Sequence, residues 1–142
     1  MHIAIGSDHA GFRLKEQLVE HLRAAGHKVE DKGTFSEEST DYPDYAHAVA
    51  RDVAEKRVEQ GIVICGSGNG VNITANKHHG VRSALAWNKE VAELARQHNN
   101  ANVLALPARY ISTEEAIAIT DAFLGTDFEG GRHQRRVDAI EQ

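Results

Sequence analysis

The sequence predicts an α/β fold in which one parallel sheet is covered by helices on both faces. Short runs of apolar and β-branched residues alternate with longer segments whose apolar residues recur at helical spacing. This alternation is typical of parallel sheets, because successive parallel strands need a crossover connection, usually a helix. The chain has 142 residues, a length that fits one domain with one core. We therefore expect residues 1–142 to form a single domain.

Five segments have the character of buried strands. The clearest is Gly61–Cys65, a continuous apolar run that is followed by a glycine-rich loop. In chain order the five predicted strands are 1–5, 28–31, 61–65, 81–87 and 102–106. They predict a three-layer α/β/α sandwich with a five-stranded parallel sheet, Rossmann-like or flavodoxin-like.

Helices are predicted between the strands. Leu14 and Leu18 belong to a helical repeat that Gly26 is suited to end, and Pro43 fits the first turn of a second helix. Ser112–Glu115 matches a capping box ahead of a third helix. The other predicted helical segments are 71–76, 89–98 and a C-terminal tail over 131–142. Because the tail has few apolar residues, we expect it to pack on another surface, such as a partner subunit.

Composition excludes several function classes. The chain carries 16 Lys and Arg against 21 Asp and Glu, a net charge of −5, which disfavours a general nucleic-acid or anionic-membrane binder. The one cysteine, Cys65, can form no disulfide within the chain. The first apolar stretch, 3–5, is too short for a secretory signal, and no segment is long enough to span a membrane. We therefore expect a cytoplasmic protein.

Polar side chains follow several predicted strands where each strand ends. Asp8 and His9 follow the first, Cys65 and the loop Gly66–Gly70 follow the third, and Arg109 lies just beyond the fifth. Carboxyl ends of parallel strands meet at one edge of a sheet, where such folds bind their ligands. The sequence thus predicts a functional site at that edge.

The loop Gly66–Gly70 has three glycines in five residues between a strand and a helix. It lacks the Lys-Ser/Thr end of a phosphate-binding Walker loop and the spacing of a dinucleotide-binding loop. Its backbone amides suit an anion or a developing oxyanion, although a simple tight turn is the alternative. Cys65, just before the loop, has two possible roles. It is either a small core residue or, beside the amides of a helix N-terminus, a base or nucleophile.

Other candidates also have a structural alternative. Asp8 suits an N-cap and His98 a helix C-terminus, so each could be structural. Arg132 and Arg136 are four residues apart and share one helix face, which suits either a phosphate or plain solvation. No two histidines have metal-ligand spacing with a supporting carboxylate, so no metal site is predicted.

Seven motifs, taken together and in this order, resemble type B ribose-5-phosphate isomerase over nearly the whole chain. They are Gly6–Phe12, Asp31–Thr34, Asp41–Pro43, Cys65–Gly68, Ala75–Lys77, Arg96–Asn99 and Gly131–Arg136. The resemblance implies interconversion of ribose 5-phosphate and ribulose 5-phosphate through a cis-enediolate, with neither metal nor cofactor. It also implies a homodimer or a dimer of dimers whose subunits share each site.

The resemblance also implies residue roles. Cys65 matches the catalytic base of one branch of the family, since Val71 stands where another branch has a glutamate. Ser67 matches a proton-shuttling or enediolate-binding hydroxyl, and His98 matches the residue that opens the furanose ring. Asp8 and Asn99 match sugar-hydroxyl contacts. The implied phosphate ligands are His9, Arg109, Arg132 and Arg136, and the rest of the expected substrate site is Tyr42, Gly66, Gly68, Asn69 and Gly70.

Two alternatives stay open at this stage. One is a galactose-6-phosphate or allose-6-phosphate isomerase of the same superfamily. Galactose-6-phosphate isomerases pair unlike subunits, whereas this chain carries the base, the ring-opening histidine and the phosphate arginines together. The other alternative is a non-catalytic phosphate- or nucleotide-binding module that uses the same loop.

Overall fold

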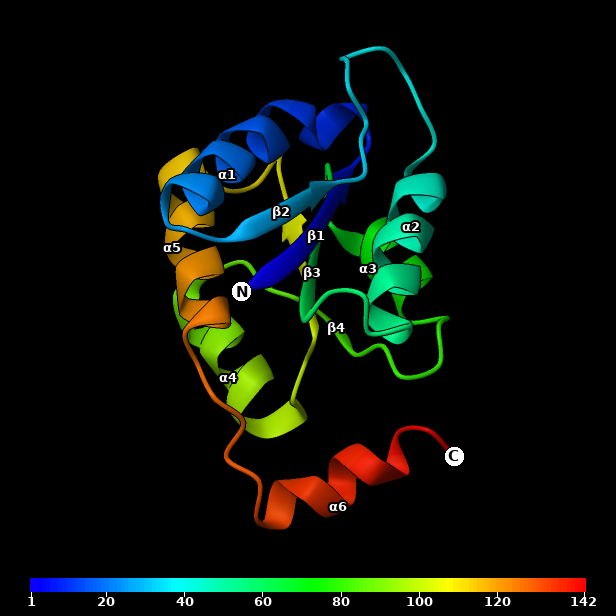
Figure 1. Ribbon diagram of the computed structural model, residues 1–142, viewed down its shortest axis with the longest axis vertical. Coiled ribbons are helices and arrows are strands. Elements are labelled where there is room, and N and C mark those ends of the chain that lie inside the picture. Colours follow the sequence, from blue (N-terminus) through cyan, green and yellow to red (C-terminus); the bar gives the residue numbers. More distant parts are fainter.

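The computed structural model describes all residues, 1–142. A sheet of five parallel strands runs through it in the order β2-β1-β3-β5-β4 (Figure 1). The strands are β1 (His2–Ser7), β2 (Lys28–Asp31), β3 (Gln60–Cys65), β4 (Ser83–Leu85) and β5 (Val103–Pro107). The predicted parallel sheet is confirmed. Its order begins like that of flavodoxin, 2-1-3, and exchanges the last two strands.

Helices cover both faces of the sheet, as predicted. They are α1 (Phe12–Ala24), α2 (Tyr42–Ala54), α3 (Asn69–Ala75), α4 (Lys89–Asn99), α5 (Thr113–Leu124) and α6 (Arg132–Ala139), with a 3₁₀ turn, η1 (His9–Gly11). Helices α1, α4 and α5 lie on one face and α2 and α3 on the other (Figure 1). Strand residues alternate between the two cores: Ile64 joins the α1/α4/α5 core, whereas Val63 and Cys65 join the α2/α3 core.

Several element boundaries differ from the prediction by a few residues, and those of β4 and α3 have a clear cause. Strand β4 covers 83–85 and not 81–87, because the Asn102 side chain accepts the Arg82 backbone N–H and because Asn88 already caps α4. Helix α3 begins at Asn69 and not at Val71, where the Ser67 hydroxyl accepts the Asn69 N–H over 3.2 Å. Both errors come from side-chain hydrogen bonds, which apolar patterns do not reveal.

The predicted helix ends are confirmed where the sequence carried specific signals. Gly26, just past α1, has a φ of +93°, a conformation that favours glycine. The Ser112 hydroxyl accepts the Glu115 N–H, and the Glu115 carboxylate accepts the Ser112 N–H, which completes the capping box of α5. The same backbone hydrogen bond lowers the pKa of Glu115.

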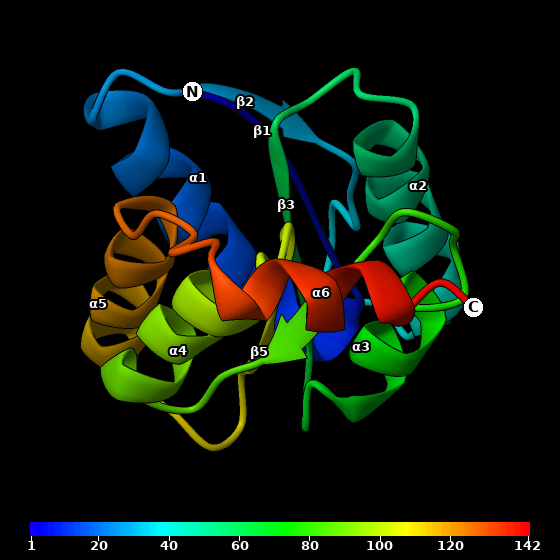
Figure 2. The ribbon, with the colours of Figure 1, turned by 90° about the horizontal axis from the view of Figure 1, so that it is seen from below.

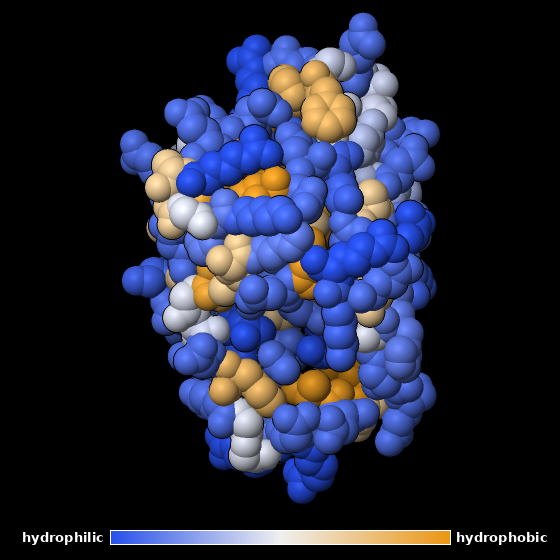
Figure 3. All heavy atoms as spheres, in the orientation of Figure 1, coloured by the Kyte–Doolittle hydropathy of each residue, from blue (hydrophilic) through white to orange (hydrophobic).

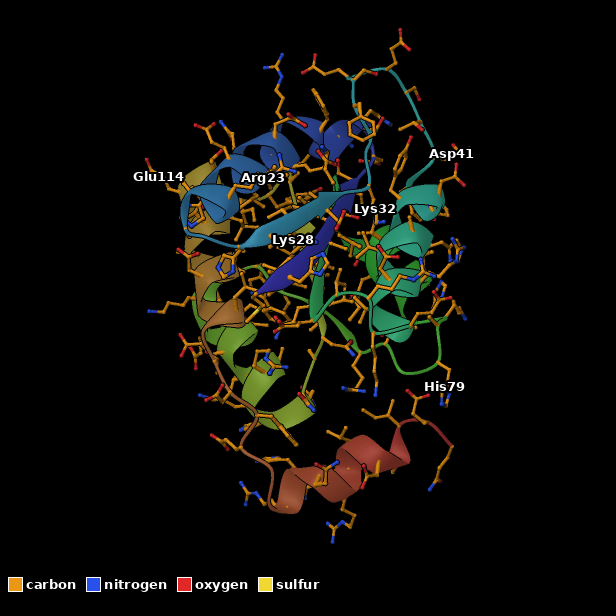
Figure 4. All side chains as sticks on the ribbon, viewed as in Figure 1. Arg23, Lys28, Lys32, Asp41, His79 and Glu114 are labelled. Carbon is orange, nitrogen blue, oxygen red and sulfur yellow. The ribbon has the colours of Figure 1, made fainter.

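Helix α6 crosses the molecule at the amino-terminal ends of the strands (Figure 2). It buries His133 and Val137, and the segment before it is fixed by a hydrogen bond from the Glu129 N–H to the Gln97 carbonyl, 3.1 Å long. At its other end, Glu141 accepts the Gly80 N–H and lies 2.9 Å from His79, a residue labelled in Figure 4. The tail therefore packs on its own chain, and its packing on a partner stays a prediction.

The face shown in Figure 3 is mostly hydrophilic, with separate apolar spots. Lys28 and Lys32 lie at the two ends of the edge strand β2, where charged side chains discourage pairing with a second sheet (Figure 4). None of the helices has the length and apolar character that a membrane span requires.

A histidine pair between α2 and the loop after α3 gives a pH-dependent contribution to stability. Nδ1 of His47 lies 2.7 Å from Nε2 of His78. Burial is the main cause that lowers the pKa of His78, and His47 and Arg51 add to it. Because the unfolded chain then binds more protons, this contribution is full above the unfolded pKa of about 6.5 and is lost as the pH falls below it.

We expect the free energy of unfolding, measured by urea denaturation, to decrease between about pH 7 and pH 5. The variant His78→Gln should show a smaller decrease. The exposed neighbour His79 provides the control, because His79→Gln leaves the pair intact. An equal pH dependence in His78→Gln and the wild type would contradict this assignment.

Candidate active site

A hollow of about 360 Å³ lies at the carboxyl ends of the strands. It sits beside β1 and β3, which is where the strand order reverses direction and where open α/β sheets bind ligands. Its walls come from the segments after β1, β3 and β5 and from the start of α2. The lining residues are Asp8, His9, Ala10, Tyr42, Cys65, Gly66, Ser67, Gly70, Arg109 and Tyr110.

The backbone joins three parts of this hollow. The Asp8 N–H donates to the Ile64 carbonyl over 3.3 Å, which ties the end of β1 to the end of β3. The Ala108 N–H donates to the Cys65 carbonyl over 2.9 Å, and the Arg109 N–H to the Gly66 carbonyl over 3.0 Å. These bonds hold Cys65 between Asp8, which follows β1, and Arg109, which follows β5.

Cys65 meets both of the descriptions that the sequence left open. It is buried, with 5% of its surface exposed, and belongs to the α2/α3 core. It also lines the hollow, at the last position of β3. Its place at the end of a buried strand gives a thiol that is held by packing and still reaches the site.

Two glycines of the loop after β3 allow close contacts that a side chain would block. A Cβ at Gly66 would lie 2.9 Å from Nη1 of Arg109, and one at Gly70 would lie 2.5 Å from Cε1 of Tyr42. The loop therefore does more than turn the chain. Its glycines let a guanidinium and a phenol ring lie directly against the backbone that borders the hollow.

The middle of the loop is shaped differently. Gly68 has a φ of +76°, and a Cβ there would lie 2.5 Å from Cδ1 of Leu85. Gly68 and Asn69 are predicted to contact the substrate, but neither lines the hollow. Gly68 lies against Leu85 of β4, and Asn69 is the first residue of α3. Ser67 does line it, and its hydroxyl accepts the Asn69 N–H.

Asp8 and His9 both face the hollow, and each also has a structural contact. Oδ1 of Asp8 accepts the N–H groups of Ala10 and Gly11, at 3.0 and 3.2 Å, so Asp8 is the N-cap of η1. Nδ1 of His9 lies 3.2 Å from the backbone nitrogen and oxygen of Thr40. These contacts fix both side chains in orientation.

The remaining predicted site residues lie elsewhere, at the amino-terminal edge of the sheet. They are His98 and Asn99 in the last turn of α4, with Arg132 and Arg136 exposed on α6. A helix that links parallel strands runs opposite to them, so the C-terminal end of α4 lies at the edge away from Cys65. Within one chain, the expected site is divided into two separate groups.

The second group contains a contact that sequence spacing did not indicate. The rings of His98 and His133 stack with centroids 4.3 Å apart and planes 13° from parallel. Glu129 lies beside both, with Oε1 3.9 Å from Nε2 of His98 and 3.5 Å from Nε2 of His133. Desolvation is the main cause that lowers the pKa of His133, and His98 adds to it.

Two residues of the hollow, Ala10 and Tyr110, were not predicted. Tyr110 is 76% exposed, and the only signal was its position beside Arg109. A larger hollow, of about 770 Å³, lies at the amino ends of the strands and includes His2, Arg57 and Arg82. The larger hollow has neither a thiol nor a glycine-rich loop among its lining residues, so the smaller hollow is the candidate active site.

Comparisons with known proteins show the family to which the chain belongs. The sequence pattern of the family described as Ribose/Galactose Isomerase matches residues 3–140. Ribose-5-phosphate isomerase B of Escherichia coli (strain K12) is 52% identical over 138 residues, which is 97% of this chain and 93% of that protein. The corresponding protein of Mycolicibacterium paratuberculosis (strain ATCC BAA-968 / K-10) is 46% identical over 100% of this chain and 91% of its own.

Solved structures are similar over the whole fold. Ribose 5-phosphate isomerase from Thermotoga maritima has a TM-score of 0.97 at 51% identity, covering 99% of this chain and 97% of that one. Ribose-5-phosphate isomerase B from Mycoplasma genitalium, solved with bound ribulose-5-phosphate, has a TM-score of 0.95 at 48% identity, covering 98% and 93%. With a sequence pattern matched from end to end and a shared fold at this level of identity, the chain belongs to the ribose/galactose isomerase family.

Proposed function

We propose that this protein is an enzyme that interconverts ribose 5-phosphate and ribulose 5-phosphate through a cis-enediolate. The observation that carries the proposal is the hollow at the β1/β3 edge, where a thiol, a glycine loop and a carboxylate meet. Relatives named ribose-5-phosphate isomerase B support it, as does the ribulose-5-phosphate bound by the Mycoplasma genitalium protein.

In the proposed mechanism Cys65, as thiolate, removes the proton from C2 of the open-chain aldose and returns it to C1. Negative charge then develops on the oxygens at C1 and C2, which exchange a proton. The loop amides and the Ser67 hydroxyl border the hollow and are suited to stabilise that charge. A well-placed donor of this kind typically contributes about 3–4 kcal/mol. The reaction needs no redox cofactor, because one carbon is oxidised as its neighbour is reduced.

The phosphate group would be held away from the reacting carbons. His9 and Arg109 line the hollow and would supply the first contacts to the phosphate, Arg109 as a cation and His9 as a hydrogen-bond partner. Binding energy from a remote phosphate positions C1 and C2 against the base. Local cations are important here because the chain as a whole carries a net charge of −5, which repels an anionic substrate.

The site would be completed by a second copy of the chain. His98, Asn99, Arg132 and Arg136 lie at the edge of the sheet opposite to Cys65, so they cannot reach the hollow of their own chain. In a two-fold dimer the exposed group of each subunit can enter the hollow of the other, which gives two equal sites. We therefore propose a homodimer, or a dimer of dimers, in which His98 of one subunit opens the furanose ring at its partner's Cys65.

The cell compartment we propose is the cytoplasm. A single unpaired cysteine suits a reducing environment, and the proposed thiolate base depends on that cysteine staying reduced.

Steady-state turnover tests the proposed function. We expect measurable isomerisation of ribose 5-phosphate with EDTA present, and lower kcat/KM for allose 6-phosphate and galactose 6-phosphate. A higher kcat/KM on a six-carbon substrate would change the assigned substrate within the family. Binding of sugar phosphates without turnover would indicate a non-catalytic module.

Replacing Gly66 by alanine should weaken phosphate binding through Arg109. The new methyl group would lie 2.9 Å from Nη1 and 3.1 Å from Cδ of Arg109, so the guanidinium must move. Loss of one charge-assisted hydrogen bond costs about 1.5–3 kcal/mol, so we expect KM for ribose 5-phosphate to rise at least about tenfold with a smaller change in kcat.

A double-mutant cycle checks that the effect passes through Arg109. If it does, the double variant Gly66→Ala/Arg109→Ala has the same KM as Arg109→Ala alone. Fully additive effects of the two substitutions would show that Gly66 acts on the loop itself and not on the guanidinium.

A further inference from the structure

Three side chains with metal-binding atoms meet outside the hollow. His98 comes from the last turn of α4, Glu129 from the segment between α5 and α6, and His133 from α6. One ligand atom from each of the three side chains lies within 4.8 Å of the other two, and Oε1 of Glu129 is near Nε2 of both histidines. At 3.9 and 3.5 Å, the two contacts of Glu129 are too long for hydrogen bonds.

The backbone around this group is fixed before any ion binds. The Glu129 N–H donates to the Gln97 carbonyl over 3.1 Å, and the His133 N–H donates to the Gly130 carbonyl over 3.1 Å. Nε of Arg96 donates to the Thr126 carbonyl over 3.0 Å, which ties the same segment to α4. Binding would therefore require side-chain movement and no refolding of the segment.

The donor set and the spacing suit a borderline divalent cation. Two imidazoles and one carboxylate are a common zinc ligand set, in which a water fills the fourth position. Bonds of about 2.0–2.1 Å in tetrahedral geometry place neighbouring ligand atoms about 3.3 Å apart. The 3.5 and 3.9 Å separations are close to this value, and the two stacked rings need to rotate so that both Nε2 atoms face one ion.

We propose that His98, Glu129 and His133 bind Zn²⁺, and that the ion inhibits the enzyme by withdrawing His98. The inhibition rests on the proposed function, in which His98 opens the sugar ring, whereas the binding does not. Imidazole ligands exclude Mg²⁺ and Ca²⁺, which prefer oxygen donors. Arg132 and Arg136 carry positive charge on the same helix as His133 and lower the affinity for a cation, so we expect the binding to be reversible.

Calorimetric titration of the metal-free protein with Zn²⁺ tests the binding. We expect one site per chain, an affinity for Zn²⁺ that falls at least about tenfold in His133→Gln and in Glu129→Gln, and no binding of Mg²⁺. Two controls separate this group from the other zinc-binding side chains. Cys65→Ser removes the thiol and His79→Gln removes the histidine paired with Glu141, and both should keep the site.

Two results would overturn the proposed site: Zn²⁺ binding that is lost in Cys65→Ser or His79→Gln, or binding of equal affinity in wild type, His133→Gln and Glu129→Gln. Nitrogen-15 spectra of the histidine rings give a second measurement. Zn²⁺ should shift Nε2 of His98 and His133 and leave the ring of His79 unchanged.

The inhibition is measured as the Zn²⁺ concentration that halves ribose 5-phosphate turnover, relative to the uninhibited rate of the same variant. We expect chelator to restore the rate, and the half-inhibiting concentration to rise about tenfold or more in Glu129→Gln. If Zn²⁺ binds at His98, Glu129 and His133 and turnover stays at the uninhibited rate, the proposed inhibition is refuted. A protein that binds zinc there and isomerises no sugar phosphate would instead refute the proposed function.

Discussion

Replacing Cys65 by alanine is expected to lower kcat for ribose 5-phosphate by about 10³-fold, because the group proposed to remove the proton from C2 is then lost. Cys65 lines the hollow at the end of β3, and the loop, Asp8 and Arg109 around it stay in place. We therefore expect the Kd of the sugar phosphate, measured by calorimetry, to change by no more than a few-fold. Stability should fall by only about 1 kcal/mol, since a single small buried group is removed.

The variant Cys65→Ser separates a base from a packing residue. Serine nearly preserves the size of the side chain, but its hydroxyl is not ionised near neutral pH, so it should lose as much activity as alanine. A Cys65→Ser enzyme with wild-type turnover would show that the thiol only fills the core, as its burial alone suggests.

Mixing two inactive variants is expected to restore activity if each site is shared between subunits. A chain with Cys65→Ala keeps His98, Arg132 and Arg136 intact, and a chain with His98→Asn keeps an intact hollow. In a mixed dimer one of the two sites combines both intact parts. With random exchange half of the dimers are mixed, so the mixture should reach about one quarter of wild-type activity.

Arg136 provides a second, independent partner for this experiment. It is exposed on α6, so Arg136→Ala should leave the fold unchanged, and it should also complement Cys65→Ala. Native mass spectrometry would confirm that the subunits exchange. Exchanged mixtures no more active than the separate variants would show that His98 and Arg136 do not act at the partner's hollow.

Local patterns in the sequence were sufficient for most of the fold. The alternation of Ile62, Val63 and Ile64 between two cores and the capping box at Ser112 depend on neighbours along the chain, so both were predictable. The short β4 was not, because the Asn102 side chain that replaces its hydrogen bonding lies about 20 residues away.

The same division applies to the site. Asp8, Cys65 and Arg109 lie at or just after the ends of parallel strands, and parallel strands end at one edge, so the sequence is sufficient to predict that they meet. A helix between parallel strands runs opposite to them, so the sequence could also place His98, at the end of α4, at the other edge. The tertiary structure was needed to place Arg136 there, because its position depends on the path of α6 across the sheet. It also decided that His98, Glu129 and His133 form one group, since their contacts join two helices and the segment between α5 and α6, and contacts between separate elements leave no periodic trace in the sequence.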